Sequence, residues 1–305
     1  MESVVSINNI SKKYGKSLVL DSVSFDIPKG SIFGLVGRNG AGKTTLMRII
    51  TGLAEPTSGT YSISGISSSD KKILSVRRRI GSIIESPAVF KNLSAYDNIK
   101  LQYINLGMTS FDDIPELLEL VELKDTGKKA AGKFSLGMRQ RLGIAVALCG
   151  KPDILILDEP INGLDPQGII QMREILLKIC KERHTTILIS SHILEELSKL
   201  ATHYAFIEGG KILQTLSSDE LMSRVKKSSR IKVSDTETLC PVFDREKVEY
   251  KVDGEDTVDI YTDIAASKIV ALANEAGVEV ISINENNESL EGYFMNLVAK
   301  REGLS

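Results

Sequence analysis

The sequence has almost no net charge and few cysteines. Its 305 residues hold 38 lysines and arginines against 40 acidic residues, a formal net charge of −2. A balance this close to neutral provides no electrostatic argument for a nucleic-acid partner. The three cysteines (Cys149, Cys180 and Cys240) are an odd number and lie far apart without metal-ligand spacing. They therefore predict reduced thiols of a cytosolic protein.

Long apolar runs are also missing from the chain. The longest candidate, Leu142 to Cys149, falls far short of the roughly 20 residues that a membrane-spanning helix needs. Met1 to Ser3 do not open a signal peptide. We therefore expect any membrane role to come through a partner. The composition, 42% hydrophobic and 26% charged, is ordinary for a globular protein of one large or two smaller domains.

The most informative stretch runs from Gly37 to Thr45 and matches the phosphate loop G-x-x-x-x-G-K-[ST] at every fixed position. A predicted strand precedes it and a predicted helix follows it. The glycines permit a backbone whose N–H groups, with the helix N-terminus, point at phosphates. The alternative is a chance glycine-rich turn. The predicted nucleotide-binding residues here are Gly37, Asn39, Gly40, Gly42, Lys43, Thr44 and Thr45, with Lys43 on the β and γ phosphates and Thr44 on Mg²⁺.

Two later apolar runs end on polar side chains suited to hydrolysis. Residues 154–157 predict a parallel strand buried on both faces, followed by Asp158 and Glu159. Ligands bind beyond the carboxyl ends of such strands. Asp158 is therefore expected to hold Mg²⁺, and Glu159 to orient or deprotonate an attacking water. The run 185–191 ends on His192, whose imidazole is placed to hydrogen-bond a γ-phosphate. The alternatives are two acids that simply end a strand and a structural histidine.

Three further positions are ambiguous from local sequence. Tyr14 lies between predicted antiparallel strands 4–10 and 22–27, and either stacks on a base or covers the sheet. Ser135 begins a helix, which either binds an anion or is a plain capped core helix. Glu85 ends a predicted strand before Ser-Pro, and either lies near a metal or is a solvated strand end.

The chain changes character twice along its length. Residues 88–147 are mostly helical and interrupt the strand-rich pattern, which predicts an inserted helical subdomain within residues 1–216. A linker helix is expected over residues 217–228. Residues 229–305 then predict a small α+β domain of strands 230–233, 248–252, 257–261 and 278–283 with helices 264–276 and 289–300. That domain carries no catalytic constellation.

The order of these elements resembles the ATP-binding subunit of ABC transporters over roughly residues 3–216. The resemblance implies an α/β fold, the ABC-type P-loop ATPase, with a RecA-like core, an antiparallel β subdomain and the inserted helical subdomain. It implies an ATPase that uses ATP and Mg²⁺. It also implies that Tyr14 stacks on adenine and that His192 is the switch histidine.

The same resemblance assigns the residues that face a second nucleotide. The segment from Phe134 to Met138 looks like the signature motif, although the family's usual form is L-S-G-G-Q and this one is F-S-L-G-M. Ser135 and Gly137 are the groups expected to approach the γ-phosphate. The segment Gly163–Asp165 matches the D-loop, so Asp165 joins the expected nucleotide-binding residues.

The informative departure from the family is Glu85, because most members carry glutamine there. Glutamate before Ser-Pro is similar to the subgroup that serves lantibiotic self-immunity and to bacitracin-type peptide-resistance exporters, and Glu85 can still offer an oxygen to Mg²⁺ or water. The resemblance implies that this chain lies on the cytoplasmic face of the membrane, bound to separate polytopic permease subunits. It also implies a second ATP-binding subunit, most simply an identical copy, paired head-to-tail with ATP between the two.

Other functions share parts of this pattern. Within transporters, the cargo could instead be another drug or a lipid. A non-transport ABC ATPase of translation or DNA repair is the next alternative, but the chain has one cassette and no heptads. A small-molecule kinase or GTPase would share only the phosphate loop. It would not need Ser135, Glu159 and His192 together.

Overall fold

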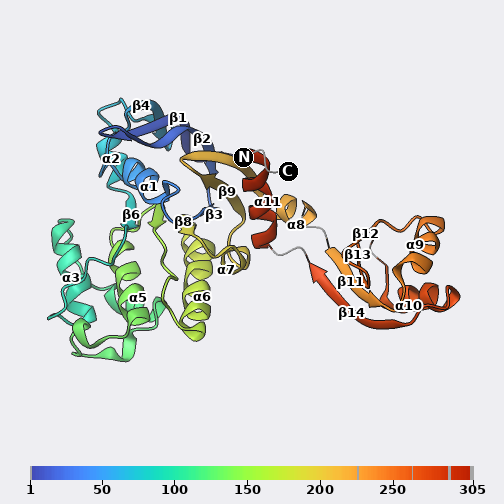
Figure 1. Ribbon diagram of the computed structural model, residues 1–305. Helices are drawn as coiled ribbons and strands as arrows, with labels where there is room; N and C mark the ends of the chain where they lie inside the picture. Colours follow the sequence, from blue (N-terminus) through green and yellow to red (C-terminus); the bar gives the residue numbers. More distant parts are fainter. Residues whose placement is uncertain (1, 225–226, 263, 288–289, 303–305) are drawn as a thin grey trace. The chain divides into compact units, whose positions relative to one another are not determined.

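The computed structural model describes residues 2–224, 227–262, 264–287 and 290–302 (Figure 1). The chain divides into two compact units, Met1–Ser218 and Asp219–Ser305. No helix in the described ranges is long and apolar enough to cross a bilayer. All three cysteines are free thiols.

The first unit contains an antiparallel sheet of strand order β2-β1-β4-β5. Its strands are β1 (Ser3–Tyr14), β2 (Ser17–Pro28), β4 (Ser58–Ile63) and β5 (Ile66–Ser67). The first two are longer than predicted because bulges hide the alternation of apolar and polar residues. The pairing shifts register between Ile7 and Ile10, and Asn9 has a positive φ of 50°. Tyr14 therefore ends a strand, and the turn is Gly15-Lys16.

The second sheet of this unit has the order β10-β9-β3-β8-β7-β6, parallel except for β10. Its strands are β3 (Ile32–Val36), β6 (Ile80–Ile83), β7 (Ile154–Leu157), β8 (Thr186–Ser191), β9 (His203–Glu208) and β10 (Lys211–Ser217). Every residue of β3, β7 and β8 is buried, as the apolar runs predict. Because Val36 pairs with Ser191 and Leu157 with Ile189, the loops after these three strands leave one edge of the sheet.

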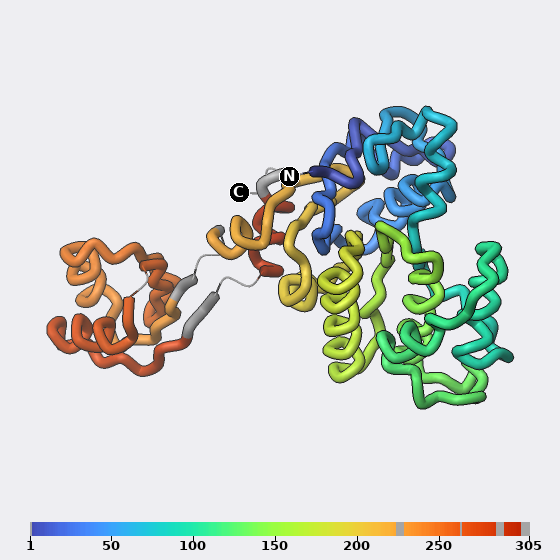
Figure 2. The backbone as a smooth tube through the Cα atoms, turned by 180° about the vertical axis from the view of Figure 1, so that it is seen from behind, coloured from blue at the N-terminus to red at the C-terminus, as the bar shows by residue number. Residues whose placement is uncertain are grey.

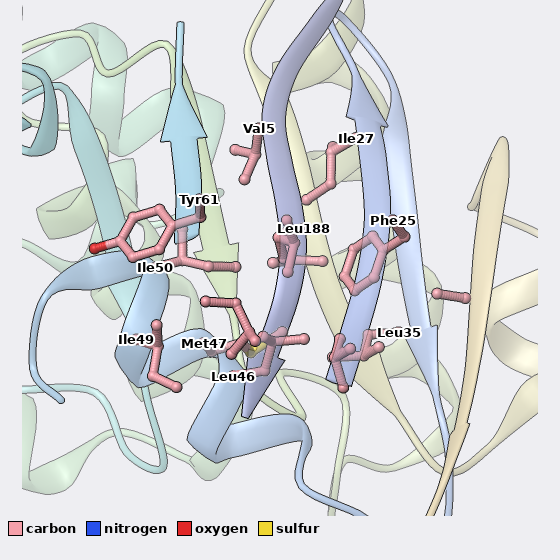
Figure 3. Packing of buried hydrophobic residues seen from close by; sticks show 14 of the residues in the cluster. Val5, Phe25, Ile27, Leu35, Leu46, Met47, Ile49, Ile50, Tyr61 and Leu188 are labelled. Carbon is pink, nitrogen blue, oxygen red and sulfur yellow. The ribbon is translucent and has the colours of Figure 1, made fainter. Parts of the chain in front are cut away.

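Helix α1 (Lys43–Thr51) joins the two sheets into one core (Figure 3). Leu46, Met47, Ile49 and Ile50 are fully buried on this helix, and they pack with apolar residues of both sheets, such as Val5 and Leu188. Burial of a leucine, isoleucine or methionine side chain stabilises the folded state by about 1.5–3 kcal/mol. The start of α1, where the phosphate loop ends, is therefore held on a rigid support.

Between β6 and β7 the chain is helical, within the predicted range 88–147. The helices of this segment are α3 (Ala95–Asn105), α4 (Ile114–Leu120) and α5 (Leu136–Ala147), with short 3₁₀ turns at Lys124–Thr126 and Ala131–Lys133. The remaining helices are α2 (Ile73–Arg77), α6 (Pro166–Arg183) and α7 (Leu194–Ser198). Figure 2 shows α5 and α6, in green and yellow-green, lying side by side.

The second unit has a βαββαβ order around a four-stranded antiparallel sheet, β12-β13-β11-β14. Its elements are β11 (Lys227–Val233), α9 (Thr236–Arg245), β12 (Tyr250–Val252), β13 (Thr257–Ile260), α10 (Ala266–Glu275), β14 (Val280–Asn287) and α11 (Leu290–Glu302). The pattern is that of a ferredoxin-like fold. Such a fold is shared by many unrelated functions, so it assigns none by itself.

The structure differs from the sequence prediction at two places in this part of the chain. The sequence prediction missed α9, because Pro241 within the segment reads as a helix breaker. Asp235 caps that helix through the Thr238 N–H, and Leu239 and Phe243 are fully buried on its inner side, so packing outweighs the proline. The linker helix expected over residues 217–228 is shorter: α8 spans Ser218–Arg224, and β11 already begins at Lys227.

Candidate active site

The backbone of the phosphate loop requires glycine at several positions, as Gly42 and Gly37 illustrate. Gly42 has a φ of 108°, and a Cβ on it would lie 2.6 Å from Cδ2 of Leu20. A Cβ on Gly37 would lie 2.3 Å from the carbonyl oxygen of Ile207. Within this described stretch no side chain caps α1, whereas Ser94, Ser135 and Asp165 cap α3, α5 and α6. The first N–H groups of α1 are therefore left for an anion.

Lys43 places a buried cation inside this loop. Its side chain is 5% exposed, and Nζ donates to the carbonyl oxygens of Gly37 and Arg38 at 2.6 and 3.2 Å. Nζ also lies 3.2 Å from Oε1 of Glu159, which forms an ion pair with it. An ammonium held at this place is suited to contact the phosphates of a nucleotide.

Thr44 and Asp158 bring together the oxygen atoms that a divalent cation prefers. The Thr44 hydroxyl donates to Oδ2 of Asp158 at 2.7 Å, and the Ser190 hydroxyl donates to Oδ1 at 2.6 Å. Hydroxyl and carboxylate oxygens with remaining positions for phosphate and water fit Mg²⁺. In the described part of the chain no group of three or more His, Cys, Asp or Glu side chains is gathered as a cation site.

Glu159 and His192 are hydrogen-bonded to each other. Nδ1 of His192 lies 2.7 Å from Oε2 of Glu159, and the Glu159 N–H donates to the Ser190 hydroxyl at 2.9 Å. Glu159 has a positive φ of 49°, a conformation that non-glycine residues seldom adopt and that clusters at functional sites. The carboxylate is thus fixed at the edge of the cavity, as a base that orients or deprotonates water must be.

One cavity gathers seven of the predicted residues, six of the phosphate loop and Glu159. It is lined by Val19, Arg38, Asn39, Gly40, Ala41, Gly42, Lys43, Thr44, Thr45 and Glu159. Gly37 begins the same loop. Asp158 and His192 adjoin it through the contacts with Thr44 and Glu159. The predicted roles of these residues in binding and catalysis remain predictions.

Ser135, Gly137 and Asp165 line a different pocket, together with Gly163 and Leu164. Ser135 caps α5 by accepting the Met138 N–H at 3.2 Å, which leaves its own O–H as a donor. Asp165 caps α6 by accepting the Gly168 N–H at 3.0 Å. These residues form a second surface rather than part of the phosphate cavity.

Tyr14 and Glu85 also lie outside the lining of the phosphate cavity. The Tyr14 side chain is 46% exposed at the end of β1, with Nζ of Lys12 4.9 Å from the ring centre. Glu85 is ion-paired with Arg48 of α1. Among the described residues no hydrogen bond joins Glu85 to Thr44 or Asp158. Its role as a metal ligand is untested.

Sequence reasoning assigned no role to Ser190 or Arg48. The Ser190 hydroxyl hydrogen-bonds both the Asp158 carboxylate and the backbone N–H of Glu159. In the sequence, Ser190 stands out only as a polar residue near the end of the buried strand that precedes His192. Arg48 reads as the basic residue of a helix surface, and only the folded chain brings it to Glu85.

A strand, a glycine loop and an uncapped helix hold a buried lysine, beside a Thr–Asp pair and the carboxylate of Glu159. Together they define a P-loop nucleoside triphosphatase.

The comparisons with known proteins agree. The family described as ABC transporter matches residues 20–162. The bacitracin transport ATP-binding protein BcrA of Bacillus licheniformis is 40% identical over 98% of both chains. The lantibiotic transport ATP-binding protein SrtF of Streptococcus pyogenes is 48% identical over 69% of this chain and 89% of its own.

Solved structures match the same part of the chain. The dimeric post-hydrolysis structure of the ATP-binding cassette MJ0796 bound to ADP and Pi has a TM-score of 0.63 at 26% identity, covering 70% of this chain and 98% of that one. The chain therefore belongs to the ABC transporter family as an ATP-binding subunit, and it is an ATPase. These matches confirm the family expected from the motifs. ATP-binding subunits of this family pair with one another and with membrane permeases.

The position of Tyr14 makes its expected role testable. Stacking of a base on an aromatic side chain is worth roughly 1–3 kcal/mol, so Tyr14→Ala should weaken ATP binding about tenfold, whereas Tyr14→Trp should keep it. Tyr96→Ala, a change at another exposed tyrosine, serves as the control. Calorimetric titration with ATP measures all three. If Tyr14→Ala and the unaltered chain bind ATP with equal affinity, Tyr14 covers the sheet and does not stack on the base.

Proposed function

We propose that this chain is the ATP-hydrolysing subunit of an exporter that removes peptide antibiotics of the bacitracin or lantibiotic kind from the cell membrane. The observation that carries the proposal is the end-to-end match to BcrA, over 98% of both chains. A match of this extent includes the second unit as well as the cassette. The BcrA of Enterococcus faecalis supports the same reading, at 38% identity over 98% of this chain.

The assembly we infer contains two copies of the chain, head to tail, on the cytoplasmic face of the membrane, bound to separate polytopic permease subunits. The two separate surfaces on one chain support this arrangement. The phosphate cavity holds Lys43 and Glu159, while Ser135, Gly137 and Asp165 line another pocket. A triphosphate between two copies would meet the N–H groups of α1 from one and the N–H groups and Ser135 hydroxyl of α5 from the other.

Each residue has a distinct task in this proposal. Lys43 and the N–H groups of the phosphate loop bind the β and γ phosphates, and Tyr14 orients the base. Thr44 and Asp158 would hold Mg²⁺, and the ion would neutralise developing charge on the phosphates. Glu159 accepts a proton from, or orients, the attacking water. His192 holds Glu159 and is placed to donate to the γ-phosphate. Loss of the γ-phosphate then loosens the pair of copies.

The sensitivity of cells to different antibiotics tests which cargo the exporter removes. Cells that lack this chain should become more sensitive to bacitracin-like or lantibiotic peptides, and the unaltered chain should restore resistance. A Glu159→Gln chain, expressed at the same level, should not. The same cells exposed to chemically unrelated drugs provide the control. Unchanged peptide sensitivity together with a new sensitivity to an unrelated drug or lipid would assign the other cargo, and no change in any case would contradict an export function.

A further inference from the structure

A rare tight turn fixes the segment that follows strand β6, residues Ile84–Pro87, hereafter the 84–87 segment. The Ser86 N–H donates to the carbonyl oxygen of Ile84 at 2.9 Å, and Glu85 between them has a φ of 69°. A bond from residue i+2 to residue i around a positive φ defines a γ-turn of the strained type. Such conformations persist only where the surrounding structure holds them, and they cluster at switch regions and functional sites. The direction of the Glu85 side chain is therefore imposed by this turn.

On one side, this turn directs Glu85 to the helix that begins at the phosphate loop. Nη2 of Arg48 contacts Oε1 of Glu85 in an ion pair. Arg48 lies on α1, one helical turn after Thr44, which lines the phosphate cavity. A guanidinium–carboxylate hydrogen bond is charge-assisted and directional, so it joins the segment to α1 at a defined place.

On the other side, the segment packs against helix α5. A Cβ on Gly143 would lie 2.6 Å from Cβ of Pro87 and 3.1 Å from Cδ1 of Ile83. Gly143 thus lets the segment approach α5 more closely than any other residue would. Ser135 and Gly137 are at the start of this helix. The 84–87 segment consequently touches both the phosphate-binding helix and the helix that carries Ser135.

We propose that Arg48 is a positioning residue, which ties the 84–87 segment to α1 through its ion pair with Glu85. When a triphosphate engages Lys43 and Thr44, any displacement of α1 is carried by Arg48 to Glu85 and through Pro87 to α5. Glu85 then acts through Arg48 rather than by contacting the metal. The inference needs only ATP binding at the phosphate loop and does not depend on the cargo.

The chain contains no tryptophan, so a single introduced tryptophan reports on this segment without background. Phe90, which is 54% exposed and three residues beyond Pro87, is a suitable site. In a Phe90→Trp, Glu159→Gln chain, which we expect to bind ATP with strongly reduced hydrolysis, saturating Mg-ATP should change the tryptophan emission. Adding Arg48→Gln or Glu85→Gln should each reduce that change at least twofold, and combining both should reduce it no further. The exchanged pair, Arg48→Glu with Glu85→Arg, should restore most of the ATP-induced change in emission.

The ion pair between Arg79 and Asp153 provides a matched control, because it is similarly exposed and also flanks β6. Arg79→Gln should leave the emission change intact. If the substitutions only disturbed the local structure, the exchanged pair would not restore the emission change, so restoration distinguishes coupling from a structural effect. If Arg48→Gln leaves the change intact, or if the parent chain shows none, the ion pair does not couple the segment to α1. If both single variants lose the change and the exchanged pair does not recover it, Glu85 acts by another contact, such as the metal, and the proposal is wrong.

Discussion

Replacing Glu159 by glutamine should lower kcat at least ~100-fold while ATP remains bound, because a positioned general base contributes typically 10²–10⁴-fold. Glutamine has nearly the same shape and keeps a hydrogen bond to His192, but it cannot accept a proton from water. Oε1 of Glu159 lies 3.2 Å from Nζ of Lys43, so removing its charge leaves Lys43 fully available to the phosphates. ATP affinity should therefore be equal or tighter. Phosphate release measures the first effect and calorimetry the second.

A matched control separates this effect from a general change in charge. Glu182→Gln removes an exposed carboxylate from the last turn of α6 and should leave both kcat and ATP affinity unchanged. Hydrolysis by Glu159→Gln at the rate of the unaltered chain would remove Glu159 from its assigned role. Loss of ATP binding in the same variant would instead indicate that the carboxylate supports the phosphate loop.

Lys43→Ala should weaken ATP binding by about 100-fold or more, enough to abolish it at ordinary concentrations. Hydrogen bonds that involve a charged group contribute about 1.5–3 kcal/mol, and a buried ammonium is the strongest phosphate contact that this loop offers. The change also removes the Lys43 hydrogen bonds to the carbonyl oxygens of Gly37 and Arg38, of which only the second still accepts the Ala41 N–H, so the loop itself loses support. Calorimetric titration with ATP, on protein whose thermal unfolding is still cooperative, measures the loss.

Lys211→Ala is the corresponding control. Lys211 forms an exposed ion pair with Asp21 and is 51% exposed, so its removal should change ATP affinity by less than about twofold. An unchanged affinity for the folded Lys43→Ala chain would overturn the assignment of residues 37–45 as the phosphate loop.

The nucleotide site was predictable because its parts are local in the chain. A phosphate loop is a single stretch in which strand, glycines and helix follow one another, and the acids of residues 158–159 end one apolar run. The rule that ligands bind beyond the carboxyl ends of parallel strands then brings Gly37, Asp158 and His192 to one edge. The register of β3, β7 and β8 places them there.

What escaped prediction depends on contacts between distant residues. Ser190 bonds to Asp158 across 32 positions of the sequence, and Arg48 reaches Glu85 across 37. Neither has a spacing that a local pattern can reveal. Helix α9 was missed for a related reason: a proline lowers local helix propensity, but the burial of Leu239 and Phe243 in the second unit's core outweighs that cost.

By itself, the sequence determined which groups this protein has for its chemistry: a phosphate loop, two adjacent acids and a histidine, each following a buried strand. Only the tertiary structure decided which groups restrain one another. It placed His192 on Glu159, Ser190 on Asp158 and Arg48 on Glu85, and it kept Ser135 in a separate pocket. The physical reason is that strand order and helix packing, rather than neighbourhood in the chain, set the distances over which side chains hydrogen-bond.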